Sequence, residues 1–228
     1  MSALKALAAL LCYPEAEFKE ALPEVGAALA ADRRLTQACR AELACLISDM
    51  EAGELMDIQE RYVGLFDRIP SLSLHLYEHV HGDSRDRGMA MVRLVEMYRQ
   101  HGLEIEAREL PDYLPLFLEF LSLLPEAESR RLLTDAGPVL AGIGQRLSRR
   151  GSRYAAVFAA LSAIGGAEIA VAEDEAPEPA EDFAALDKAW EEAAVTFGPQ
   201  SMAESRSGCE RVAAAVDRMN APGGGVRS

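Results

Sequence analysis

Two histidines and a carboxylate stand close together near the middle of the chain, at Glu78, His79 and His81. Imidazole nitrogens and carboxylate oxygens are common metal ligands. Residues two apart on a helix point to nearly opposite sides, so the two histidines could share a metal only in an extended segment. We find no third ligand of suitable spacing. Besides a metal site, a structural polar cluster near a loop and a partner-binding surface therefore stay open.

A dense charged turn follows directly, with Asp83, Arg85 and Arg87 next to Gly82 and Ser84. Asp83 or Ser84 can cap the amino end of a helix that runs to His101. The helical spacing predicts a buried stripe of Met91, Val92, Val95 and Tyr98. The charged turn is read either as a solvated helix start or as part of a binding surface.

A carboxylate also stands on an otherwise apolar helix, expected from Asp112 to Leu124. Asp112 can cap this helix, and Glu119 is the only charged residue from 113 to 124. A helix that is apolar nearly all round is central to a domain or lines a groove. Glu119 must then join a buried ion pair or face a groove that receives a cationic partner.

Motifs for catalysis are missing from the sequence, which has no nucleophile elbow, no phosphate-binding loop and no complete dinucleotide-binding glycine motif. Gly142 and Gly144 lack the third glycine of that motif and lie in a helical run. The four cysteines form no C-x-x-C pair, which indicates reduced thiols in a cytoplasmic protein. We predict that the protein is not an enzyme and holds no metal or cofactor of its own.

Composition favours an all-α fold, because leucine and alanine dominate and only 6% of the residues are aromatic. The net charge of −14 argues against nucleic-acid binding. The sequence contains no stretch of about 18 apolar residues, so we expect no membrane-spanning segment. The apolar run from Ala6 to Leu11 is interpreted as a first helix and not as a signal peptide.

The predicted organisation is one multi-helix globular domain followed by less regular segments. Helices are expected at about 3–11, 15–31, 36–53, 55–66, 84–101, 112–124, 126–149 and 153–170, with a loop at 67–73. The domain would span 1–172. Six acidic residues and two prolines predict a linker at 173–182. An amphipathic helix carrying Trp190 is expected at 183–197, and a disordered tail at 198–228.

Two long segments carry a family resemblance: Tyr77-Glu78-His79-Val80-His81-Gly82-Asp83-Ser84-Arg85-Asp86-Arg87-Gly88 and Glu109-Leu110-Pro111-Asp112-Tyr113-Leu114-Pro115. Both resemble the respiratory nitrate reductase assembly chaperones, the NarJ-type delta subunits. The segments Tyr62–Arg68 and Ala189–Glu192 fit the same family, and the likeness extends from about Leu4 to Phe197. In the wider superfamily a histidine often follows the aspartate, whereas here Tyr113 stands at that position.

The resemblance implies an all-helical chaperone without catalysis. It implies binding of the cofactor-free catalytic (alpha) subunit of respiratory nitrate reductase, partly through that subunit's N-terminal peptide. It also implies that the chaperone allows insertion of the molybdenum cofactor before membrane docking, in contact with molybdenum cofactor biosynthesis proteins. An alternative is a helical scaffold or adaptor subunit that remains in a respiratory complex.

We expect the client peptide to bind a groove formed by the helix at 55–66, the segment 78–87 and the helix at 112–124. The expected contact residues are aromatic, apolar or charged: Tyr62, Leu65, Phe66, Glu78, His79, His81, Arg85, Arg87, Asp112, Leu116, Phe117, Glu119 and Phe120. Apolar residues of a helical peptide would contact the apolar members, and basic residues of the peptide would meet the carboxylates.

Overall fold

Leucine and alanine at helical spacing build the first helix, α1 (Ala3–Leu11), whose residues are nearly all buried. The side chain of Ser2 caps this helix by accepting a hydrogen bond from the backbone N–H of Lys5 at 3.3 Å. A helix that is apolar on almost every side must be surrounded by other helices. In the computed structural model α1 contacts α2, α7 and α10, and it is the centre of the fold.

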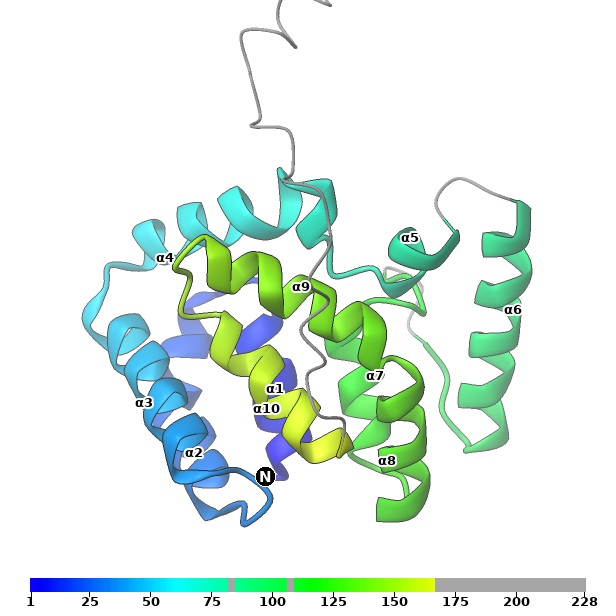
Figure 1. Cartoon of the computed structure of the whole chain (residues 1–228), viewed down its shortest axis with the longest axis horizontal. Coiled ribbons are helices and arrows are strands. Elements are labelled where there is room, and N and C mark those ends of the chain that lie inside the picture. Colours follow the sequence, from blue (N-terminus) through cyan, green and yellow to red (C-terminus); the bar gives the residue numbers. More distant parts are fainter. Residues whose placement is uncertain (82–84, 106–108, 167–228) are drawn as a thin grey trace, which may run out of the picture. The chain divides into compact units, whose positions relative to one another are not determined.

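The structure describes residues 1–81, 85–105 and 109–166, and in these ranges it is helical without strands (Figure 1). The remaining α-helices are α2 (Ala16–Ala31), α3 (Gln37–Ala52), α4 (Leu55–Tyr62), α5 (Leu76–His81), α6 (Arg85–Gln100), α7 (Leu114–Leu121), α8 (Glu126–Asp135), α9 (Gly137–Arg149) and α10 (Ala155–Gly165). A π-helical turn, Val63–Asp67, extends α4, and a 3-10 turn spans Pro70–Leu72. The predicted all-α class is confirmed.

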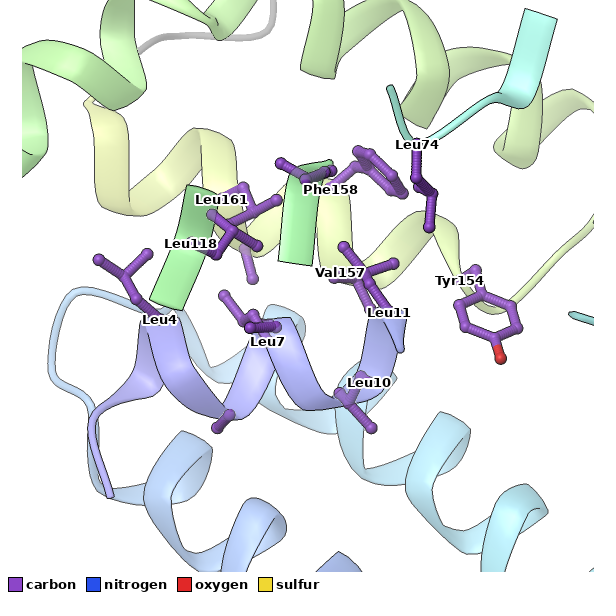
Figure 2. Close-up of a cluster of buried hydrophobic side chains, with 14 of the residues drawn as sticks. Leu4, Leu7, Leu10, Leu11, Leu74, Leu118, Tyr154, Val157, Phe158 and Leu161 are labelled. Atoms are coloured by element: carbon purple, nitrogen blue, oxygen red, sulfur yellow. The ribbon is translucent and has the colours of Figure 1, made fainter. Parts of the chain in front are cut away.

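Helices α1, α7 and α10 share one core. Figure 2 shows Leu4, Leu7 and Leu11 of α1 directed toward the neighbouring helices. They face Leu118 of α7 and Val157 and Leu161 of α10. Leu7, Leu11 and Leu118 are fully buried. Helices α2 and α3 cover the other side of this core, whereas α6 contacts mainly α5 and stands at the edge of the domain (Figure 1).

The predicted single helix at 126–149 is wrong, because the chain forms two helices there, α8 and α9. Pro138 occupies the first turn of α9. A proline inside a continuous helix would remove one backbone hydrogen bond and clash with the preceding turn, so a new helix starts at this point. The loop expected at 67–73 contains the short 3-10 turn, and α5 was not expected as a helix.

The predicted buried stripe of α6 is correct only in part. Tyr98 is buried and Met91 and Val95 are partly buried, but Val92 is 62% exposed. The buried positions are Leu94 and Tyr98, one helical turn apart, so the stripe is narrower and rotated relative to the expected one. The linker, the Trp190 helix and the tail predicted beyond residue 172 lie outside the described residues.

Candidate functional site

The two sequence segments of the resemblance meet in the structure. His75 and Tyr113 form an isolated antiparallel bridge, which we call the 75/113 bridge. The N–H of Leu114 donates to the carbonyl of Leu74 at 2.8 Å, and the N–H of Leu76 donates to the carbonyl of Asp112 at 3.1 Å. This bridge fixes the start of α5 against the start of α7.

Asp112 holds this junction together from a fully buried position. Its carboxylate accepts a hydrogen bond from the N–H of Tyr77 at 3.1 Å and lies 3.3 Å from His75 Nδ1. Asp112 therefore caps α5, and the prediction that it caps the following helix is wrong, since α7 has no side-chain cap. The hydrogen bond to Asp112 raises the pKa of His75 above its usual value.

The burial of Asp112 contradicts the expectation that its side chain contacts the client. With none of its surface exposed, its carboxylate cannot meet a basic residue of a peptide in this conformation. Local sequence could not reveal this role, because the partner N–H lies 35 residues away along the chain.

Glu78, His79 and Arg87 form a polar cluster around Ser73. Arg87 donates to Glu78 Oε1 at 3.1 Å, Ser73 Oγ donates to Glu78 Oε2, and His79 Nε2 donates to the carbonyl of Ser73 at 2.8 Å. These contacts stabilise the turn between the 3-10 helix and α5. The side chains of His81 and Arg85 lie outside the described residues, and among the described residues no three His, Cys, Asp or Glu side chains gather as metal ligands would.

The aromatic residues expected in the groove are mostly buried. Tyr62 and Phe66 are in the core, and Leu65 is partly buried. The Tyr62 hydroxyl donates to the carbonyl of Leu11 at 2.9 Å and lies 3.2 Å from the hydroxyl of Tyr113. Tyr62 thereby ties α4 to the end of α1 and to the 75/113 bridge.

Helix α7 is a core helix, and the expectation that it offers a wide apolar face is wrong. Phe117 and Phe120 are 5% and 3% exposed, and Phe120 packs against Tyr98 with ring centroids 4.5 Å apart. Of the expected apolar contacts on α7, only Leu116 is partly exposed. The central-helix interpretation of the apolar pattern is the correct one.

Glu119 lies on the outer side of α7, where its side chain is 51% exposed and contacts Lys5 of α1 with Nζ 3.0 Å from Oε1. Of the two alternatives left open for Glu119, the buried ion pair is excluded, because the pair with Lys5 is exposed. The pair joins two helices that run antiparallel, because the other end of α1 lies beside Tyr113. Since Lys5 pairs with Glu119 and the end of α1 lies near Tyr113, we infer that Ala9 lies opposite Leu116.

We define the α1–α7 face as the outer surface made by Lys5, Ala9, Cys12, Tyr13, Tyr113, Leu116 and Glu119. Tyr13 is 45% exposed and packs edge-on against Tyr62, with ring centroids 5.6 Å apart. Ala9, Tyr113 and Leu116 are partly buried against the core. Sequence reasoning missed Lys5, Cys12 and Tyr13, since the only local signal was a proline that ends the first helix.

Carboxylates surround the aromatic end of this face. The residue Cys12 is exposed, but desolvation of its thiol by neighbouring groups, together with Glu119 and Glu109, raises the pKa of the thiol to about 11. Burial raises the pKa of Tyr113 to about 12, and Glu109 and Asp67 contribute to the rise. Burial is the largest cause of both pKa rises, and the nearby carboxylates add to it because negative charge disfavours a second negative charge. The α1–α7 face thus combines partly exposed aromatic and apolar groups with negative potential.

A second apolar surface lies on α5 and α6, where Val80, Met89 and Val92 are exposed. Below the end of α6 a cavity of about 350 Å³ is lined by Val95, Arg99, Leu103, Glu104, Ile105, Glu109 and Pro111. The cavity lining thus combines one arginine, Arg99, with two carboxylates, Glu104 and Glu109.

Comparison with known proteins gives the family. The family model described as nitrate reductase delta subunit matches residues 16–160. The chain belongs to the nitrate reductase delta subunit family. It is 44% identical over 192 residues to the nitrate reductase molybdenum cofactor assembly chaperone NarJ of Escherichia coli K12, which covers 82% of this chain and 81% of that protein. The resemblance seen in the sequence is confirmed.

Two further relatives carry related names. The chain is 37% identical over 201 residues to the probable nitrate reductase molybdenum cofactor assembly chaperone NarW of Escherichia coli K12, covering 86% of this chain and 84% of that protein. It is 29% identical over 166 residues to the probable chaperone NarJ of Bacillus subtilis 168, covering 70% and 88%. These family members are named as assembly chaperones and not as enzymes. None of the helices in the described part of the chain has the length and apolar character of a membrane span.

Proposed function

We propose that this protein is a chaperone that binds the cofactor-free catalytic subunit of respiratory nitrate reductase. It would hold that subunit while the molybdenum cofactor is inserted and would leave before the finished enzyme docks at the membrane. The observation that carries the proposal is the 44% identity to an assembly chaperone over most of both chains.

We propose further that the client's N-terminal peptide binds the α1–α7 face. This face differs from the groove expected from the sequence, which did not include α1, because Phe117, Phe120 and Asp112 are buried. Leu116 and Glu119 keep their proposed contact roles. An amphipathic helical peptide could lay its apolar stripe along such a surface, and basic residues of the peptide would meet the carboxylates.

Calorimetric titration of the full chain with a synthetic N-terminal peptide of the catalytic subunit tests the first proposal. A saturable binding heat is expected, and a peptide of the same composition in scrambled order should give none. If the folded chain gives no saturable heat with either peptide, recognition through the N-terminal peptide is wrong.

Alanine substitutions on the two exposed apolar surfaces test the location. Tyr13→Ala should weaken binding by about 1 kcal/mol or more, because a partly exposed aromatic ring would lose its contacts with the peptide. Val92→Ala is the matched control on α6, where the replaced side chain is 62% exposed. A loss of affinity in Val92→Ala and none in Tyr13→Ala would move the site to α6.

The scaffold alternative has a separate test. A scaffold subunit would remain in stoichiometric amount with nitrate reductase purified from membranes, whereas a chaperone would be present only in complexes of the cofactor-free subunit. Both outcomes can be scored on the same purified fractions.

A further inference from the structure

Lys5 and Glu119 form an ion pair on the α1–α7 face when no client is bound. Their charged atoms lie 3.0 Å apart, and the side chains are 54% and 51% exposed. An ion pair this open to water is screened and contributes little to folding. The contact therefore has little structural purpose, and its carboxylate can change partner at low cost.

Apolar groups lie beside this ion pair, and an amphipathic peptide could cover them. Ala9 and Leu116, which lie between the pair and Tyr113, are partly buried apolar groups. A helical peptide presents apolar side chains one turn apart and can carry a basic residue at the next turn. If the apolar stripe of the peptide packed on Ala9 and Leu116, its basic residue would reach Glu119, which the ammonium group of Lys5 contacts in the free chain.

We propose that a lysine or arginine of the client takes the place of Lys5 at Glu119 when the client peptide binds. This inference rests on the proposed function and adds how the face selects its client. Lys5 acts as a competitor built into the chaperone. A segment that is apolar but lacks the cation would not displace it, so the face prefers an amphipathic basic segment over any exposed apolar one.

The proposal predicts that replacing Lys5 and replacing Glu119 change the affinity for the peptide in opposite directions. Lys5→Gln should tighten binding of the N-terminal peptide of the catalytic subunit by about two- to five-fold, because Glu119 is then free for the client. Glu119→Gln should weaken binding by a similar factor. In the double variant, removal of Lys5 should bring no gain, because the two residues act through one contact.

Two control variants separate this contact from the overall charge of the protein. Arg149→Gln on α9 removes the same charge as Lys5→Gln, and Glu42→Gln on α3 removes the same charge as Glu119→Gln; both residues are exposed. Neither control should change the affinity by as much as the variants on the face. A peptide whose lysines and arginines are replaced by glutamine should bind more weakly and should not distinguish Lys5→Gln from the unmodified chain.

The results that overturn the proposal differ from those that overturn the proposed function. If the unmodified peptide binds but Lys5→Gln binds with equal or lower affinity, the competitor role of Lys5 is wrong while peptide binding stands. The same holds if the gain from Lys5→Gln persists in the Glu119→Gln background or is matched by Arg149→Gln. If no variant binds the peptide at all, both proposals fail.

Discussion

Replacing Asp112 should destabilise the whole domain. Asp112→Ala removes a fully buried carboxylate that caps α5 through the N–H of Tyr77 and contacts His75. A hydrogen bond to a charged group is worth about 1.5–3 kcal/mol, and the donors left behind lose a partner as well. We therefore expect a loss of about 2–4 kcal/mol in the free energy of unfolding, or roughly 5–15 °C in Tm for a domain of this size.

The loss should also depend on pH. The pKa of His75 is raised in the folded chain by its bond to Asp112, so this contact stabilises the fold below the unfolded pKa of about 6.5 and the gain is lost as pH rises through the higher folded pKa. Asp112→Asn keeps an acceptor for the Tyr77 N–H but removes the charge. Its destabilisation should be larger at about pH 6 than at about pH 9.

Urea unfolding followed by far-ultraviolet circular dichroism measures both effects, provided that the slope of free energy against urea is the same in each variant. Asp112→Ala should lose the most stability, and Asp112→Asn should fall between it and the unmodified chain. If both variants unfold within about 0.5 kcal/mol of the unmodified chain, the capping role is wrong. A loss in Asp112→Asn that is the same at both pH values would refute the contact with a charged His75.

Other predictions concern packing and thiol chemistry. Gly144→Ala should lose about 1–3 kcal/mol in urea unfolding, because a Cβ there would come within 2.8 Å of Phe158 Cβ, whereas Gly88→Ala, with nothing within 4 Å, should be neutral or gain up to ~1 kcal/mol. Equal effects of the two would refute the close helix contact. Cys12, with its pKa raised to about 11, should be alkylated far more slowly near pH 8 than a cysteine in an unfolded peptide, as measured by peptide mass spectrometry. Glu119→Gln should speed this alkylation, and an unchanged rate would place Glu119 too far from the thiol.

Most helices could be predicted from the sequence, because apolar spacing, caps and prolines act locally. Thr36 caps α3 by accepting from the N–H of Cys39 at 3.2 Å, as expected for a helix that starts there. The break between α8 and α9 was missed, although Pro138 marks it. Val92 was wrongly assigned to the buried stripe of α6: among the described side chains of this helix Leu94 and Tyr98 are buried, and Met97 packs against the core as well.

The candidate site was predictable in its region but not in its details. The apolar pattern of α7 was compatible with a core helix and with a groove, and only the packing of α1 against it decides between them. Glu119 was correctly singled out as exceptional, but its partner Lys5 lies more than a hundred positions away in the sequence. Spacing within one segment carries no information on such distant pairings.

The affinity of the full chain for the catalytic subunit, measured with and without its molybdenum cofactor, tests the central claim most directly. The chaperone account predicts saturable binding to the cofactor-free subunit and a strong loss of affinity once the cofactor is in place. Equal affinity for both forms, or binding only to the cofactor-loaded form, would contradict it.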